Sequence, residues 1–220
     1  MTHPETFEAV LFDMDGTLVD STSVVERIWT AFAARHHLDP VEVLRFAHGR
    51  PTAATVSNFV NGADAIATDI TLVAAAEATD TAGVREVAGA HQFLSALHGL
   101  WAVVTSATPP ITQLRMTAAG LPTPPLLVTA EDVSQGKPSP EGYRLAATKL
   151  GVDIEHCLIF EDAGPGIAAA VASGGTVVVV GNYQGENAAG LIQISDFSTT
   201  SIRNGVLHTG VTGGAGVHRA

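Results

Sequence analysis

Residues 9–17 read Ala9-Val10-Leu11-Phe12-Asp13-Met14-Asp15-Gly16-Thr17, an apolar run that ends abruptly at a carboxylate. A short run that is apolar on both faces is typical of a buried strand in a parallel sheet. Two aspartates, a glycine and a threonine lie within the five residues after this run. We therefore expect a buried strand with polar side chains directly after its carboxyl end.

Four further apolar runs occur along the chain, and helical patterns separate them. Strands that alternate with helices predict a doubly wound α/β core around a parallel sheet, the Rossmann-like class. Gly151 is expected to end the helix that precedes it. The expected strands span residues 100–104, 126–128, 158–160 and 177–180, and the expected helices span residues 90–97, 111–119, 140–150 and 167–173.

The stretch from about residue 21 to residue 80 contains no strand-like run, is rich in alanine and has only short turn signals. We expect a small helical module here, inserted between the first and second strands. Its expected helices span residues 24–35, 40–47, 53–60 and 71–78. The predicted division is an α/β core over residues 1–19 and 84–208, a helical cap over 20–83 and a flexible tail over 209–220, with hinges near 18–21 and 81–87.

The composition excludes several classes of protein. The 220 residues are 46% hydrophobic and 15% charged, so the chain is expected to fold around a sizeable core rather than stay disordered. A net charge of −11 disfavours binding to nucleic acids and to anionic membranes. A phosphate-binding site on such a chain must be positive locally, through a metal ion and a few placed donors.

The number of cysteines and the N-terminal residues indicate the cellular compartment in which the protein is expected. Cys157 is the only cysteine, so no intramolecular disulfide can form. Residues 1–8 contain acids and no apolar segment, and no apolar run approaches the roughly 20 residues that span a bilayer. We expect a cytoplasmic protein without membrane or nucleic-acid partners, either a monomer or a homodimer.

Polar side chains follow four of the expected strands. Because parallel strands end at the same edge of a sheet, these side chains should meet where ligands bind in open α/β folds. They are Asp13, Asp15, Gly16 and Thr17 after the first strand, Ser106 and Thr108 after the second, Lys137 after the third, and Glu161 and Asp162 after the fourth.

This combination of side chains suits phosphate chemistry at a metal ion. Carboxylates gathered at one edge repel each other unless a hard cation joins them, and a few oxygen ligands favour Mg²⁺. The cation neutralises and orients a substrate phosphate. Lys137 adds a point charge, the Ser106 hydroxyl can hold another phosphate oxygen, and one carboxylate is left to attack phosphorus.

The sequence resembles the haloacid dehalogenase superfamily. The residues that carry the resemblance match its four motifs in order and spacing from about residue 7 to residue 180, and the helical insertion resembles the cap that one subclass places after the first motif. Residues 48–50, 101–108 and 160–167 further resemble the small sugar-phosphate and glycerol-phosphate phosphatases of that subclass. The motif residues are Asp13-Met14-Asp15-Gly16-Thr17-Leu18-Val19, Ser106, Gly136-Lys137-Pro138 and Glu161-Asp162.

The resemblance implies a role for each matching residue. Asp13 would be the nucleophile that becomes an aspartyl-phosphate, and its other oxygen would bind Mg²⁺. Asp15 would protonate the leaving group and then activate water, while its backbone carbonyl binds the metal. Asp162 would be the third ligand, with Glu161 either a direct ligand or a neighbour of the ligands. The implied phosphate- and substrate-binding residues are Gly16, Thr17, Ser106, Ala107 and Lys137, with His48 and Arg50 from a cap loop.

Three features distinguish branches of the family. Asp15 is present, whereas dehalogenases proper lack the second acid, and no lysine precedes Lys137, whereas phosphonate-cleaving relatives need one in the cap. Sugar phosphomutases carry a histidine twelve residues after the nucleophile, where this chain has Val25. The expected function is hydrolysis of a small sugar or polyol phosphate monoester, with a sugar phosphomutase and a non-catalytic phosphometabolite-binding protein as alternatives.

Several local alternatives stay open in the sequence. Thr105 could replace Ser106 if the strand register differs by one residue, and Ser106 could also cap the helix that follows. His48 and Arg50 could belong to an ordinary exposed loop.

Overall fold

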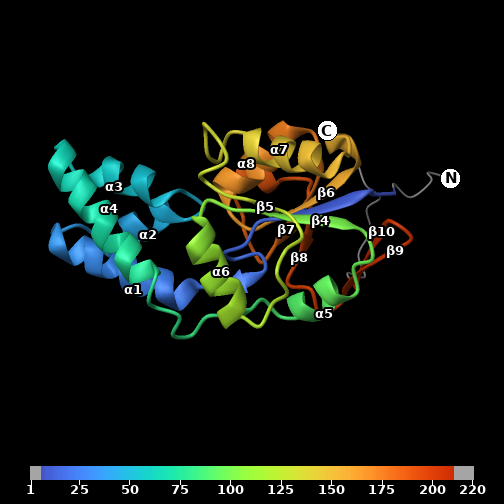
Figure 1. The fold of residues 1–220 in the computed structure, drawn as a ribbon, viewed down its shortest axis with the longest axis horizontal. Helices are drawn as coiled ribbons and strands as arrows, with labels where there is room; N and C mark the ends of the chain where they lie inside the picture. The colour runs from blue at the N-terminus through green and yellow to red at the C-terminus, as the bar shows by residue number, and fades with distance from the viewer. Residues whose placement is uncertain (1–5, 211–220) are drawn as a thin grey trace.

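The computed structural model describes residues 6–210 and contains a six-stranded parallel sheet in the order β5-β4-β1-β6-β7-β8 (Figure 1). β1 lies in the centre, hydrogen-bonded to β4 on one side and to β6 on the other. The chain therefore reverses its winding direction at β1, which confirms the predicted doubly wound α/β class. The strands are β1 (Ala9–Phe12), β4 (Leu100–Val104), β5 (Leu127–Val128), β6 (Cys157–Glu161), β7 (Thr176–Val180) and β8 (Ile192–Ile194).

Helices cover both faces of this sheet (Figure 1). The side chains of β1 alternate: Val10 and Phe12 join one apolar core, and Ala9 and Leu11 join the core on the opposite face. All four are buried, which explains why β1 is apolar on both faces. The covering elements are α5 (Ala90–Ser95) and α6 (Pro109–Ala118) on the first face, and α7 (Glu141–Leu150), η1 (Ile154–His156) and α8 (Gly164–Ser173) on the second.

Four phenylalanine rings form the centre of the first core. Phe160 of β6 stacks on Phe12 of β1 with 5.2 Å between ring centroids. Phe93 of α5 packs edge-on against Phe160 at 5.6 Å, and Phe197 lies 5.3 Å from Phe160. These rings join the two strands that carry Asp13 and Glu161 at their ends, so their packing fixes the strands beneath the site.

The insertion after β1 is helical, as predicted. Its helices pack around their own apolar cluster, to which Trp29, Phe32 and Val56 belong, and they lie beside the carboxyl ends of the core strands (Figure 1). Within residues 6–210, no helix combines the length and the apolarity needed to cross a membrane. The four helices are α1 (Thr22–Arg35), α2 (Pro40–Ala47), α3 (Thr52–Phe59) and α4 (Ala63–Glu77).

The two connections between this helical module and the sheet pair with each other. β2 (Val19–Asp20) and β3 (Arg85–Glu86) form a short antiparallel ladder that the sequence did not predict. Arg85 also donates to Asp20 across the ladder at 2.6 Å. The ladder lies where hinges are expected, near residues 18–21 and 81–87, and the division of the chain at residues 20 and 83 stays a prediction.

The predicted boundaries of α4 are wrong. The helix begins at Ala63 rather than at residue 71. Ile66, Ile70 and Val73 pack on the cap's apolar cluster. Leu72 and several alanines lie elsewhere around the helix, so the contrast between its faces is weak in the sequence.

The C-terminal part contains elements that the sequence analysis missed: β8, η2 (Glu186–Ala188), and the hairpin of β9 (Thr200–Arg203) and β10 (Val206–Thr209). The turn residues Asn204 and Gly205 both have positive φ, and Asn-Gly is a strong hairpin signal that was available in the sequence. Thr209 therefore ends a strand rather than beginning the predicted flexible tail, and residues 211–220 of that tail lie outside the described part of the chain.

Replacing Phe160 by alanine is expected to lower the free energy of unfolding by about 3–5 kcal/mol, because three aromatic partners would face a cavity. Urea unfolding followed by circular dichroism measures this loss. Val171→Ala is the control, since Val171 is 47% exposed and should change stability by no more than about 0.5 kcal/mol. Equal losses in the two variants would contradict a stabilising role of the aromatic cluster.

Candidate active site

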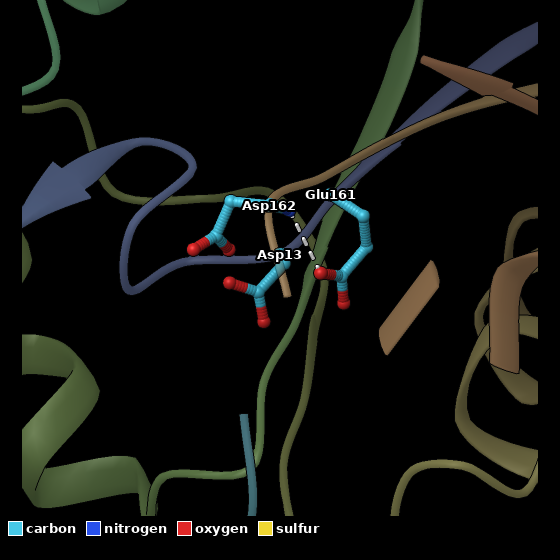
Figure 2. A group of neighbouring side chains, drawn as sticks. All are labelled: Asp13, Glu161 and Asp162. Atoms are coloured by element: carbon cyan, nitrogen blue, oxygen red, sulfur yellow. Dashed lines mark hydrogen bonds between the residues drawn. The ribbon is translucent and has the colours of Figure 1, made fainter. Parts of the chain in front are cut away.

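Three carboxylates meet where β1 and β6 end (Figure 2). Asp13 follows β1, Glu161 is the last residue of β6, and Asp162 comes next. One oxygen from each lies within 4.8 Å of the others, and all three side chains are largely buried. Such a set of hard oxygen donors fits a divalent cation, which would relieve the repulsion between the three groups.

Lys137 places its ammonium against this cluster. It comes from the loop between β5 and α7, and it forms ion pairs with Asp13 and, at 2.5 Å, with Glu161. The lysine side chain is only 7% exposed. Burial lowers the pKa of Lys137, but the carboxylates of Asp13 and Glu161 outweigh burial, so its pKa is raised and the ammonium stays charged. Burial also raises the pKa of Asp13, although Lys137 opposes that shift.

Glu161 is held by four donors. Its Oε1 accepts hydrogen bonds from Lys137 and from the Tyr143 hydroxyl at 2.8 Å, and its Oε2 accepts from the backbone N–H groups of Asp162 and Ala163 at 3.0 and 3.3 Å. A Cβ at Gly166, in the first turn of α8, would overlap this carboxylate. The glycine therefore makes room for the Glu161 carboxylate.

Asp162 is fixed from both the core and the helical insertion. Thr17 donates to its Oδ1 at 3.1 Å, and His48 contacts its Oδ2 at 3.0 Å. The bond to Asp162 raises the pKa of His48, although burial opposes this shift. Gly16 has φ of +88°, and a Cβ there would collide with the Asp162 carboxylate. Gly16 and Thr17 therefore contact a carboxylate of the cluster.

Asp15 lies apart from this cluster. Ser21 donates to its Oδ1 at 2.6 Å, and Arg115 donates to its Oδ2 at 2.8 Å. Among residues 6–210, the group of carboxylates that could share a metal ion comprises Asp13, Glu161 and Asp162, without the side chain of Asp15. The expected contact of Asp15 with the metal therefore involves its backbone carbonyl rather than its side chain.

Thr105 and Ser106 follow β4 directly and have different partners. The Thr105 hydroxyl accepts a hydrogen bond from the backbone N–H group of Ala107 at 3.1 Å, which braces the loop. Ser106 is half-buried, donates to the carbonyl of Gly49 at 3.3 Å and lines a small pocket together with Lys137. The residue before the first turn of α6 is Thr108, so the alternative in which Ser106 caps this helix is wrong.

His48 and Arg50 lie in the loop between α2 and α3. Both line a cleft of about 1150 Å³, which Gly16 and Asp162 border from the core. The Arg50 guanidinium turns back to α2, where it donates to the carbonyl of Phe46 at 2.7 Å and lies over the Phe46 ring. His48 thus contacts the Asp162 carboxylate directly, whereas the guanidinium of Arg50 binds this carbonyl at the edge of the cleft.

Arg115 is the main site residue that the sequence analysis missed. Four residues of α6 are buried, namely Ile111, Thr112, Arg115 and Met116, which recur with helical spacing. A charged residue at a position on the apolar stripe was the available signal, because burial of a charge requires partners. Tyr143 was missed as well, since a buried tyrosine in a helix looks like packing until its hydroxyl partner is known.

Comparison with known proteins places this geometry in a family. The model of the family described as haloacid dehalogenase-like hydrolase matches residues 7–174. Hexitol phosphatase A of Escherichia coli is 44% identical over 176 residues, which cover 77% of this chain and 81% of that protein. Glycerol-1-phosphate phosphohydrolase 2 of Saccharomyces cerevisiae is 33% identical over 184 residues, covering 77% and 73%.

A solved structure agrees with these relatives. A haloacid dehalogenase family hydrolase from Deinococcus radiodurans, determined with bound phosphate and sodium, superimposes with a TM-score of 0.61 at 27% identity. The match covers 86% of this chain and 90% of the other. The expected resemblance is thereby confirmed, and the chain belongs to the haloacid dehalogenase-like hydrolases, as an enzyme related to phosphatases.

Proposed function

We propose that this hydrolase removes phosphate from a small sugar or polyol phosphate monoester, with Mg²⁺ at the Asp13–Asp162 cluster. The observation that carries the proposal is the buried contact of Lys137 with Asp13, directly beside the oxygen donors of Asp162. A bound Mg²⁺ would carry two positive charges and Lys137 carries one, which together would balance the three carboxylates. The cation and the ammonium could then attract the oxygens of a phosphate dianion, although the chain has a net charge of −11.

Asp13 is the proposed nucleophile. One of its oxygens attacks phosphorus, the ester bond to the substrate oxygen breaks, and an aspartyl-phosphate and an alcohol result. Lys137 and the Ser106 hydroxyl lie on the side of the site where they can hold oxygens of the transferring group. When bound, Mg²⁺ would be held by Asp13, Asp162 and the carbonyl of Asp15, and would neutralise phosphate charge.

Asp15 is the proposed acid and base. It would give a proton to the leaving alkoxide and then take one from the water that hydrolyses the aspartyl-phosphate. In this scheme Glu161 holds Lys137 and the backbone after β6, because its two oxygens already accept four hydrogen bonds.

The proposed substrate class comes from the relatives. Hexitol phosphatase A and glycerol-1-phosphate phosphohydrolase 2 are named for polyol phosphates. The cleft at Asp162 supports a small polar substrate, because side chains that can bond hydroxyl groups line it, including Arg45, Arg50, Asn182 and Tyr183.

Phosphate release should depend on both Mg²⁺ and Asp13. With a panel of sugar, polyol and nucleotide monophosphates, we expect release from a few sugar or polyol phosphates with Mg²⁺, and none with a chelator. Asp13→Asn removes the nucleophile and should lower the rate by at least about 1000-fold. Release that survives this substitution would refute the mechanism. Isomerised product without free phosphate would indicate a phosphomutase, and binding without turnover a phosphometabolite-binding protein.

The chain's two lysines provide a matched comparison. Lys137→Met should lower the rate by at least about 100-fold, because one donor to the transferring phosphoryl group is lost. Lys149→Met should keep the rate within about twofold, since this side chain is 37% exposed and pairs with Asp132 on the surface. Initial rates at saturating substrate measure both effects. Similar losses in the two variants would contradict a specific role for Lys137.

We also propose that the helical cap, residues 20–83, opens and closes over the site. The contacts of His48 with Asp162 and of Ser106 with the Gly49 carbonyl link the cap to the core and would have to break on opening. Small-angle scattering should show a smaller radius of gyration with Mg²⁺ and a phosphate mimic such as vanadate than without them. Identical scattering curves in both conditions would rule out hinges near residues 18–21 and 81–87.

A further inference from the structure

Arg115 joins the acid–base carboxylate to the cap. Its Nη1 donates to Asp15 Oδ2 at 2.8 Å, and its Nη2 donates to Glu77 Oε1 at 3.2 Å. Arg115 belongs to α6, which covers the core sheet, whereas Glu77 is the last residue of α4 in the cap. A single guanidinium therefore contacts one carboxylate of the core and one carboxylate of the cap.

The buried charge of the Arg115 guanidinium is compensated by both carboxylates, Asp15 and Glu77. The Arg115 side chain is 4% exposed, and its Nε is buried without a hydrogen-bond partner among the described residues. A buried charge is tolerated only when it is paired, and removing one partner leaves an uncompensated charge. If Glu77 moved away with the cap, Arg115 would lose one of its two carboxylates.

Each oxygen of the Asp15 carboxylate accepts a hydrogen bond from a group that a motion of the cap would displace. Ser21, which holds Oδ1, directly precedes α1 and lies in the first connection between core and cap. Arg115, which holds Oδ2, is tied to the second half of the cap through Glu77. Thr52 of α3 also donates to Glu77, at 3.2 Å, and so fixes that carboxylate within the cap.

We propose that Arg115 is a positioning residue, which orients Asp15 for proton transfer when the closed cap brings Glu77 against it. The proposal rests on the proposed function, in which Asp15 protonates the leaving group. It goes further by assigning the orientation of the Asp15 carboxylate to a linkage of Arg115 and Glu77 between the core and the cap. An open cap would then leave Asp15 badly placed and would disfavour proton transfer before the substrate is enclosed.

Leaving-group dependence separates this role from a merely structural one. An alkyl phosphate expels a basic alkoxide and needs a proton from Asp15, whereas p-nitrophenyl phosphate expels a weakly basic phenolate and does not. The value of kcat/KM reports steps up to phosphoryl transfer, so later hydrolysis of the aspartyl-phosphate does not obscure the comparison. A distorted fold would lower kcat/KM for both esters alike.

The experiment measures kcat/KM for glycerol 1-phosphate and for p-nitrophenyl phosphate with Mg²⁺. Arg115→Gln should lose about 100-fold on glycerol 1-phosphate and at least tenfold less on p-nitrophenyl phosphate, because well-placed general acids contribute about 10²–10⁴-fold. Glu77→Gln should also lose more kcat/KM on glycerol 1-phosphate than on p-nitrophenyl phosphate, but the loss should be smaller than in Arg115→Gln. The double variant should be no worse than Arg115→Gln alone, since both substitutions break one linkage.

Arg144→Gln is the matched control. This guanidinium binds only backbone carbonyls near the end of α8, at 2.7 and 3.3 Å, and its loss should affect both esters equally and slightly. Equal losses on the two esters in Arg115→Gln and Glu77→Gln would overturn the proposal. If circular dichroism shows that Arg115→Gln does not fold, Glu77→Gln decides alone. Wild-type protein that releases no phosphate from any monoester of the panel would instead refute the proposed function.

Discussion

The burial of Lys137 between Asp13 and Glu161 is the interaction on which the rest of the site depends. Three carboxylates at one edge of a sheet would repel each other, and burial in a low-dielectric environment would make that repulsion worse. The ammonium compensates part of this charge without a metal ion. It also leaves a net excess of carboxylate oxygens, which is the condition for binding a divalent cation.

The parallel sheet makes this concentration of charge possible. The three carboxylates lie at the carboxyl ends of β1 and β6, while the same strands are apolar on both faces beneath the site. The stacked rings of Phe12 and Phe160 hold these two neighbouring strands together immediately before their carboxylates. Rigid packing thus fixes groups that would otherwise separate, and the small residues Gly16 and Gly166 let the loops approach closely.

The helical cap adds contacts to the core that depend on the position of the cap. Its contacts with the site use His48, the Gly49 carbonyl and Glu77, which reach Asp162, Ser106 and Arg115 respectively. These are polar contacts, whereas the cap's apolar cluster lies within the cap itself. Polar links of this kind exchange readily with water, so such an interface suits the proposed opening of the cap.

The fold class and the set of motif residues could be predicted from the sequence alone. Strands such as β1 are visible because they are apolar on both faces, and the residues after them must meet because parallel strands end at one edge. Short strands such as β2 and β3 have no such pattern, and α4 also carries apolar residues such as Leu72 on its exposed face, which obscures the stripe that packs on the cap cluster. The partners of Asp15 were decided only by tertiary structure. Arg115 lies 100 residues away from it along the chain, and no local spacing relates them. The pairing of Arg115 with Asp15 depends on how α6 packs against the sheet and the cap. Packing between distant segments cannot be predicted from the sequence of any single segment.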